Sequence, residues 1–408
     1  MKCRHCESIL EHVFIDLGFS PPSNAYLSIE DLDKIEVYLP LKIFVCDNCW
    51  LVQTKDYATA DTFFDHDYAY FSSFSKSWLK HAKQYVEMIS ESLQLNENSM
   101  VVEIASNDGY LLKNFVTRNI PCLGIEPTDS TASAAENEGV PVIRKFFSSE
   151  LAKELITQGK QADLIIGNNV YAHVPDINDF TRGISLLLKK DGVLTLEFPH
   201  LYSLLEQNQF DTIYHEHYSY LSLYTVSKIF NRAGLKVWHV EELSTHGGSL
   251  RVYGCHESDN RTIDESVNRV IECEAIFGLK ELDTYKNFQE EANRIKNDLL
   301  IYLINMKKEG KKISAYGAAA KGNTLLNYAG IKADLLDCVY DASPHKQNKY
   351  LPGSHIPIYS PDRIKTDAPD VILILPWNIK DEIISQLSYI KAWGGEFITA
   401  VPELAFLE

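Results

Sequence analysis

Two histidines, a glutamate and several tyrosines lie within one short run of the sequence, a density that few core segments have. The run covers residues 211–220 and reads DTIYHEHYSY. Histidine titrates nearest to neutral pH of all side chains, so an imidazole here can accept a proton, with a carboxylate to orient it and phenols to donate to a developing oxyanion. The candidates for this acid–base chemistry are Tyr214, His215, Glu216 and His217. Histidine and aromatic side chains also fill ordinary half-buried edges of folded domains, so a purely structural role for this run is the alternative.

A catalytic metal ion is a second interpretation of the same run. His215 and His217 would share one face of an extended segment, and two imidazoles with a carboxylate can hold an ion that keeps an open position. A metal content that survives replacement of both histidines by alanine would exclude this interpretation.

Four cysteines form two CxxC pairs near the amino terminus, which are Cys3 with Cys6 and Cys46 with Cys49. Four thiolates from two such turns can close a tetrahedral shell around zinc and leave no position for water, so we expect one structural zinc ion. His5 is an alternative ligand, and a redox CxxC would normally come singly. Eight cysteines in 408 residues are too few for a disulfide scaffold.

Length and charge limit the classes of protein. A chain of 408 residues exceeds one ordinary core and predicts two or three domains. The net charge of −17 argues against a nucleic-acid-binding surface. No apolar run has the length of roughly 20 residues needed to span a bilayer, and the first residues lack a signal-peptide pattern, so we expect no membrane association and a cytoplasmic location.

The elements that position these residues begin with residues 100–112. A β-branched run enters a turn of small residues and then a helix, which is the start of a doubly wound α/β sheet. Glu103 ends the strand and Asp108 lies in the turn. Because a pyrophosphate loop is usually rich in glycine, these acids favour a cationic or neutral cofactor over a dinucleotide.

Three further strands follow at residues 122–125, 162–167 and 192–199. The first ends in Glu126 and Pro127, where the ribose-binding carboxylate of a nucleoside site is expected. The second is followed by the segment NNVYAHV, which contains Asn168, Asn169 and His173.

Two other segments offer binding residues. Residues 56–76 are dense in aromatic side chains, including Tyr68 and Tyr70, and either line a pocket between domains or cover a helix. Residues 245–253 form a glycine turn before a strand, where His246 and Arg251 either face the site or belong to a hairpin corner.

The last hundred residues repeat the pattern of strand, turn and helix from residue 312 onward, which indicates a second open α/β unit. Lys321 and Asn323 lie in its first turn, where backbone N–H groups and an ammonium could hold a diphosphate. This turn lacks the GxGxxG spacing of a dehydrogenase.

Four of these motifs, VVEIASNDGYLL, GIEP, NNVYAHV and GVLTLEFPH, together resemble the successive motifs of class I S-adenosylmethionine-dependent methyltransferases. The resemblance implies that the backbone of the loop after Glu103 holds the methionine part of the cofactor. It implies that Glu126 binds the ribose hydroxyls, and that the Asn168 segment lies near the sulfonium. The cofactor-binding set is therefore Glu103, Ala105, Ser106, Asn107, Asp108, Gly109, Glu126, Pro127, Asn168, Asn169 and His173.

The whole chain resembles the sugar C-methyltransferases that act on nucleotide-activated 4-keto-deoxyhexoses, and the YHEH motif is the most specific part of the match. The resemblance implies methylation next to the ketone, commonly at C3, with His217 as the base that takes the C3 proton. Tyr214, Glu216, His215 and Tyr70 would assist it, and the substrate-binding set is Tyr68, Lys321, Asn323 and Arg251.

The expected fold class is α/β, with a doubly wound class I methyltransferase sheet between two further units. These are a small zinc-binding module with an aromatic connecting segment at 1–75, the S-adenosylmethionine-binding domain at 76–256, and a helical connector with a Rossmann-like domain at 257–408. The expected partner is a nucleotide sugar, and the oligomeric state stays open, a monomer included. An inactive, zinc-stabilised binding or regulatory protein is the alternative function.

Overall fold

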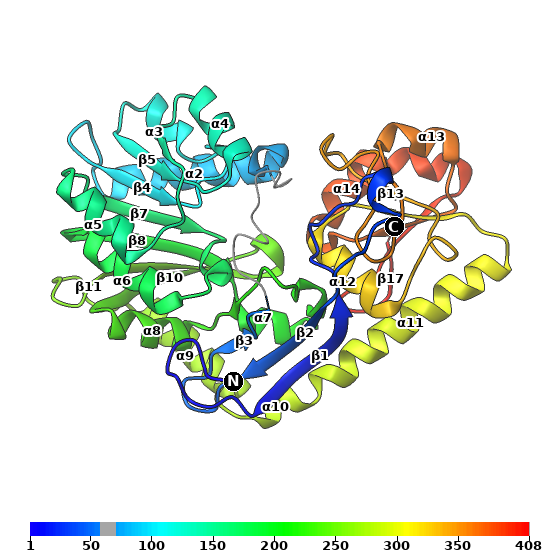
Figure 1. The fold of residues 1–408 in the computed structure, drawn as a ribbon, viewed down its shortest axis with the longest axis horizontal. Helices are drawn as coiled ribbons and strands as arrows, with labels where there is room; N and C mark the ends of the chain where they lie inside the picture. The colour runs from blue at the N-terminus through cyan, green and yellow to red at the C-terminus, as the bar shows by residue number, and fades with distance from the viewer. Residues whose placement is uncertain (58–70, 408) are drawn as a thin grey trace.

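The computed structural model describes residues 1–57 and 71–407, and three sheets organise it. Figure 1 shows the large central sheet on one side, the carboxyl-terminal sheet on the other, and strands β1 and β2 between them at one end. In the described ranges, no helix is long and apolar enough to cross a membrane.

The amino-terminal sheet is antiparallel and has the order β1-β2-β3-β9. Three strands come from the start of the chain, and the fourth follows the YHEH motif far along the sequence. The elements are β1 (His12–Ser20), the 3-10 helix η1 (Ile29–Asp31), β2 (Leu39–Val45), β3 (Val52–Thr54) and β9 (Ser219–Tyr220). The segment around the motif is thus held by the cysteine-bearing module through a strand pairing.

The central sheet has the order β10-β11-β8-β7-β4-β5-β6, and β11 alone runs against its neighbours. Its strands are β4 (Val101–Ile104), β5 (Cys122–Ile125), β6 (Val142–Ile143), β7 (Ala162–Asn168), β8 (Leu188–Pro199), β10 (Leu235–Leu243) and β11 (Ser249–His256). The inner strands are buried apolar runs because helices cover both faces. This is the open, doubly wound sheet that the sequence predicts.

The helices of this part follow the predicted amphipathic runs. For example, Ser222 caps the amino terminus of α8 by accepting from the backbone N–H of Thr225. The helices are η2 (Ser72–Phe74), α2 (Lys76–Ser92), α3 (Lys113–Thr117), α4 (Asp129–Asn137), α5 (Ser149–Thr157), η3 (Tyr171–His173), α6 (Ile177–Leu187), α7 (Leu201–Glu206), η4 (Phe210–Thr212), α8 (Leu223–Arg232) and η5 (Thr245–Gly247).

The carboxyl-terminal part begins with a helical connector, α9 (Glu265–Phe277), α10 (Asp283–Lys286) and α11 (Phe288–Lys308). A sheet of order β14-β13-β12-β15-β16-β17 follows, parallel except for β17. Its elements are β12 (Ile313–Tyr316), α12 (Ala320–Ala329), β13 (Val339–Tyr340), β14 (Ile358–Tyr359), η6 (Pro361–Arg363), α13 (Ile364–Asp367), β15 (Val371–Ile374), η7 (Trp377–Ile379), α14 (Lys380–Leu387), η8 (Ser388–Trp393), β16 (Glu396–Thr399) and β17 (Ala405–Leu407).

One hydrophobic core joins the amino-terminal sheet to the carboxyl-terminal part. Phe14 of β1 packs its ring against Phe288 of α11, with ring centroids 4.8 Å apart. The cysteine end of the module instead packs in the core of the central sheet. The module therefore connects the two larger parts, and its arrangement affects how they face each other.

The four cysteines of the two CxxC pairs form one cluster whose sulfur atoms all lie within 4.8 Å of one another. Zinc–sulfur bonds of about 2.3 Å in a tetrahedron place sulfurs roughly 3.8 Å apart, so the cluster fits a zinc ion. The cluster does not include His5, whose Nδ1 lies 2.8 Å from Asn178 Oδ1 on α6. His5 thus attaches the module to the central part.

We expect one zinc ion per chain, measured by elemental analysis, and its loss in a Cys46→Ser variant. The midpoint temperature of the first thermal transition should fall sharply, because loss of a structural metal is among the changes that lower the free energy of unfolding by more than about 4 kcal/mol. Cys273→Ser is the matched control, because Cys273 is an exposed cysteine on α9. Equal zinc content and melting in Cys46→Ser and the wild type would contradict a cysteine-bound metal.

Candidate active site

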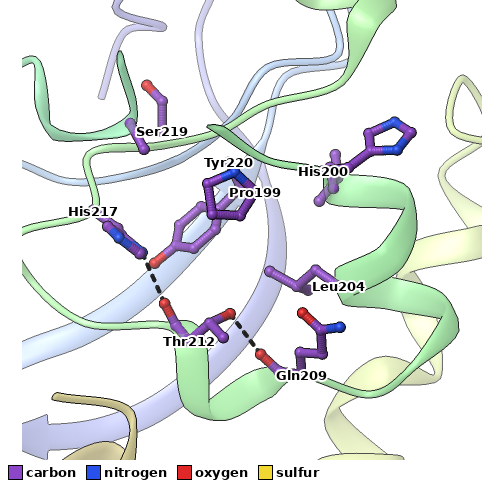
Figure 2. Close-up of a pocket in the computed structure, with 10 residues that line it drawn as sticks. Pro199, His200, Leu204, Gln209, Thr212, His217, Ser219 and Tyr220 are labelled. Carbon is purple, nitrogen blue, oxygen red and sulfur yellow. Dashed lines mark hydrogen bonds between the residues drawn. The ribbon is translucent and has the colours of Figure 1, made fainter. Parts of the chain in front are cut away.

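The imidazole of His217 is held in one tautomer by the backbone. Its Nδ1 lies 2.9 Å from the carbonyl oxygen of Thr212, so Nδ1 carries the proton and donates, and Nε2 keeps its lone pair (Figure 2). Burial lowers the pKa of His217 well below its usual value, and His173 lowers it further. His217 is therefore a neutral proton acceptor at physiological pH.

Two aromatic rings fix the plane of this imidazole. The ring centroid of Tyr214 lies 3.9 Å from that of His217, and the ring of His173 meets it edge-on at 4.7 Å. His173 Nδ1 lies 2.9 Å from the carbonyl oxygen of Glu216, and burial lowers the pKa of His173 to about 4. His173, which the sequence groups with the cofactor motifs, thus lies directly against the candidate base.

The other two members of the motif point to different parts of the chain. Glu216 Oε1 accepts a hydrogen bond of 3.3 Å from Asn24 Nδ2, while its Oε2 has no partner among the described residues. Burial raises the pKa of Glu216 to about 7. His215 Nε2 lies 3.3 Å from the carbonyl oxygen of Leu39 on β2. The structure therefore brings Tyr214 and His217 together, whereas His215 contacts the amino-terminal sheet.

A cavity borders the base, and its lining includes Ala172 and Pro199 from two of the four cofactor motifs. Its lining comes from the end of β8, from η3, α7 and η4, from the YHEH segment and from β9. The lining residues are Ala172, Pro199, His200, Leu201, Leu204, Gln209, Thr212, His217, Ser219 and Tyr220 (Figure 2). The loop after β4 contributes no residue to it. This space therefore lies behind the base, and a cofactor would have to occupy the edge of the central sheet instead.

The loop after β4 is tightly folded. Ala105, Asn107 and Gly109 have φ values of 59°, 50° and 75°, in the left-handed region. A Cβ on Gly109 would lie 3.0 Å from Cβ of Ala135, so only glycine fits there. The loop contacts η2, because the Ser72 N–H donates to Asn107 Oδ1 at 2.9 Å and the Ser73 N–H to Asp108 Oδ2 at 3.0 Å.

Glu126 closes this loop from the end of β5. Its Oε2 accepts from the Asn107 N–H at 3.0 Å, and its Oε1 accepts from the Thr128 N–H at 3.0 Å and from the Thr128 hydroxyl. Pro127 follows directly and leads into α4. The carboxylate is therefore fixed beside the cofactor loop.

Several buried polar atoms at this sheet edge have no hydrogen-bond partner among the described residues. Burial raises the pKa of Glu103 well above its usual value, and neither of its carboxyl oxygens is paired. The others are Ser106 Oγ, Asp108 Oδ1, both amide atoms of Asn168, and Asn169 Oδ1. Buried polar groups are normally satisfied, so these atoms fit a polar ligand such as the ammonium and hydroxyls of S-adenosylmethionine.

A second group of buried side chains lies where the motif segment contacts the carboxyl-terminal part. Trp377 Nε1 donates to Asp211 Oδ2 at 2.7 Å, and the Thr324 hydroxyl donates to the carbonyl oxygen of Ile213 at 2.8 Å. Burial raises the pKa of Asp211 to about 6. Lys321 Nζ donates to Asn378 Oδ1 at 2.7 Å, and Asn323 Nδ2 to the carbonyl oxygen of Ser23 at 2.6 Å.

The remaining sequence-predicted residues have the following places. Arg251 is buried and donates to Glu197 at 2.9 Å and to Glu241 at 2.8 Å, so two carboxylates hold its guanidinium within the sheet. His246 Nε2 lies 3.0 Å from Asn169 Nδ2, beside the cofactor segment. Tyr68 and Tyr70 lie outside the described residues.

Sequence reasoning missed three residues of this region. Asn24 lies in a proline-rich turn whose only local signal is the turn itself. Trp377 follows β15, and a position beyond the carboxyl end of a strand could have indicated it. Thr324 has no such signal, because a threonine within a helix usually has no functional role.

Comparisons with known proteins identify all three parts of the chain. Residues 3–64 match a family model of a zinc binding domain, residues 78–240 a model of a methyltransferase domain, and residues 244–402 a model of a C-methyltransferase C-terminal domain. The chain is 33% identical over 402 residues to the C-methyltransferase NovU of Streptomyces niveus, a match that covers 98% of this chain and 96% of that one.

Two solved structures match about half of the chain. The magnesium protoporphyrin IX methyltransferase of Synechocystis, with bound S-adenosylmethionine, has a TM-score of 0.36 and 14% identity, covering 50% of this chain and 100% of that one. A methyltransferase of Thermotoga maritima has a TM-score of 0.35 and 18% identity, covering 47% and 98%. Both scores are below 0.5, so family membership rests on the sequence relatives.

These matches confirm the expected α/β class I methyltransferase fold and the zinc-binding cysteine module. They also confirm S-adenosylmethionine as the methyl donor and imply a small-molecule acceptor. The chain belongs to the C-methyltransferase family and is an S-adenosylmethionine-dependent C-methyltransferase.

Proposed function

We propose that the enzyme methylates a ring carbon, C3, of a nucleotide-activated 4-keto-deoxysugar in deoxysugar biosynthesis. The observation that carries the proposal is the hydrogen bond of 2.9 Å between His217 Nδ1 and the Thr212 carbonyl oxygen, which leaves Nε2 as a neutral acceptor. Methylating carbon requires a carbanion equivalent, and a proton beside a ketone is acidic enough for a positioned base to remove. The resemblance to keto-sugar C-methyltransferases supplies the substrate class.

The proposed reaction starts when His217 Nε2 takes the proton from C3. The electron pair of the C–H bond forms a double bond to C4, and the carbonyl pair moves onto the oxygen, which gives an enolate. S-adenosylmethionine supplies the electrophilic methyl group on its sulfonium. The enolate carbon forms the new bond to this methyl as the carbon–sulfur bond breaks, and the proton on His217 is later released to water.

Neighbouring groups assist this step. Tyr214 orients the sugar or donates to the enolate oxygen, and its ring packs against the His217 imidazole and limits rotation of that imidazole. Tyr70 is a second donor from the aromatic segment. Glu216 has a buried oxygen to which no described residue donates, and this oxygen suits a hydroxyl of the sugar. If the base and the sulfonium lie on opposite faces of the sugar, the configuration at C3 is inverted. The stereochemistry of the product tests this arrangement.

The cofactor would occupy the edge formed by the loop after β4, Glu126 and the segment after β7. Glu103 and Asp108 suit its ammonium, Glu126 its ribose hydroxyls, and Asn169 its sulfonium end. The unpaired buried atoms at this edge support that assignment. His173 and Arg251 act indirectly, His173 by supporting His217 and Arg251 by holding Glu197.

The nucleotide sugar would extend from the base to the carboxyl-terminal domain. The amino terminus of α12 has no side-chain cap, so its backbone N–H groups remain available for a diphosphate. Lys321 and Asn323 lie in its first turn, and the buried Asn323 Oδ1 has no partner in the part of the chain that the structure describes. The proposed domain boundaries stay at residues 75/76 and 256/257, with the third domain helping to bind the substrate.

A panel of nucleotide-activated 4-keto-deoxysugars, incubated with enzyme and S-adenosylmethionine and analysed by mass spectrometry, tests the substrate class. One member should gain the mass of one methyl group on a ring carbon. Transfer to a different class of acceptor, with none of these sugars methylated, would refute it.

Replacing the base should stop turnover. His217→Ala should lower kcat by about 10²- to 10⁴-fold, the usual contribution of a general base, and keep its affinity for S-adenosylhomocysteine. His12→Ala, which changes a histidine on the outer part of β1, is the control and should keep full activity. A fully active His217→Ala enzyme would contradict the assignment of the base.

Cofactor binding should depend on Glu126. S-adenosylhomocysteine, but not NAD, should raise the melting temperature, and Glu126→Gln should weaken its binding about 10- to 100-fold, because hydrogen bonds to charged groups contribute roughly 1.5–3 kcal/mol. The control is Glu136→Gln, which changes a surface partner of Arg144 on α4. Equal titration curves for the wild type and Glu126→Gln would exclude the ribose contact.

A further inference from the structure

Lys321 lies at the junction between the carboxyl-terminal domain and the candidate base. Its Nζ lies 4.4 Å from the ring centroid of Trp377 and donates to Asn378 Oδ1 at 2.7 Å. An ammonium has three N–H donors, and Asn378 is the only acceptor among the described residues. Two donors in this mostly enclosed position are therefore available to a ligand.

Trp377 places this ammonium beside the methyltransferase part. Its indole N–H donates to Asp211, and its ring lies so close to Gly247 that a Cβ on that glycine would be 2.3 Å from a ring carbon. Gly247 follows His246, whose Nε2 lies 3.0 Å from Asn169 in the cofactor segment. The Trp377 ring therefore connects Lys321 to the space between the base and the cofactor edge.

The helix that carries Lys321 is tied to the catalytic segment. One turn further along α12, the Thr324 hydroxyl donates to the carbonyl oxygen of Ile213, the residue before Tyr214. Asp211 and Thr212 belong to η4, and the Thr212 carbonyl oxygen accepts from His217. Two hydrogen bonds between the domains thus restrict the motion of Lys321 relative to the base. They join Thr324 to Ile213 and Trp377 to Asp211.

The charges around Lys321 suit a negative charge that appears during the reaction. Burial is the main cause of the lowered pKa values of His217 and His246, and the positive charge of Lys321 lowers both further, which disfavours an imidazolium at either position. A protonated His217 next to an ammonium is unfavourable unless an anion lies with them. The enolate oxygen that forms as His217 takes its proton is such an anion.

We propose that Lys321 is a catalytic residue whose ammonium donates a hydrogen bond to the enolate oxygen formed from the substrate ketone. This inference rests on the proposed function and gives Lys321 a role at the ketone rather than at the diphosphate. The backbone N–H groups at the start of α12 then bind the diphosphate without the lysine side chain. Burial lowers the pKa of Lys321, and the negative charge of Asp211, which is hydrogen-bonded to Trp377, opposes that shift and favours the ammonium.

The test measures enolate formation separately from methyl transfer. Enzyme, an accepted keto sugar at saturating concentration and S-adenosylhomocysteine are incubated in deuterium oxide, and deuterium at the carbon next to the ketone is followed by mass spectrometry. Lys321→Met should lower the exchange rate about 10²- to 10³-fold, the usual effect of removing an oxyanion donor. Lys321→Arg should recover part of the rate.

Binding separates the two roles of Lys321. Under this proposal, Lys321→Met binds the nucleoside diphosphate that matches the accepted sugar as tightly as the wild type does. A variant with weakened nucleoside diphosphate binding and a wild-type exchange rate at saturation would assign the lysine to the diphosphate and overturn the inference. Lys332→Met, at an exposed lysine of the same domain, is the control for loss of charge.

Two further outcomes are distinguishable. If the wild-type enzyme exchanges no proton with any sugar of the panel, the proposed function itself fails. If Lys321→Met does not fold, Asn378→Ala removes the acceptor that fixes the ammonium and keeps the charge. It should slow exchange without weakening nucleoside diphosphate binding, and a wild-type exchange rate in this variant would overturn the inference.

Discussion

The structure depends on how the buried segment from Asp211 to Tyr220 satisfies its backbone hydrogen bonds. This segment contains one turn of 3-10 helix and a two-residue strand, so most of its N–H and C=O groups need partners elsewhere. The zinc module provides β3, which pairs with β9 of the segment. In the methyltransferase domain, the Ala172 carbonyl oxygen accepts from the Tyr218 N–H. In the carboxyl-terminal domain, the Thr324 hydroxyl donates to the Ile213 carbonyl oxygen. All three parts of the chain therefore determine where His217 lies.

Burial then sets the protonation of the site. It lowers the pKa values of His217 and His173 and raises that of Glu216, so the histidines are neutral and the glutamate titrates near neutrality. A neutral imidazole with its Nδ1 proton fixed by a carbonyl can only accept at Nε2. The structural zinc ion stands apart from this chemistry, because its cysteine cluster supports the segment through β3 and contributes no group to the reaction.

Much of the fold and the position of the cofactor motifs could be predicted from the sequence, because β4, β5, β7 and β8 are apolar runs followed by chemically distinctive residues. The cysteine cluster was predictable for a similar reason, since CxxC spacing is local. The contacts between domains were not predictable. These contacts join residues that lie far apart in the chain, so no local sequence pattern indicates them. They are His215 with Leu39, Asn24 with Glu216, and Trp377 with Asp211.

The proposed mechanism requires that a proton leave the sugar carbon before that carbon receives the methyl group. The most direct measurement uses a keto sugar that carries deuterium at C3, with S-adenosylmethionine, and compares deuterium released to water with methyl transferred. Under this mechanism, one deuterium is released for every methyl group transferred, and the methylated product carries no deuterium at that carbon. A methylated product that keeps the deuterium at C3 would contradict it.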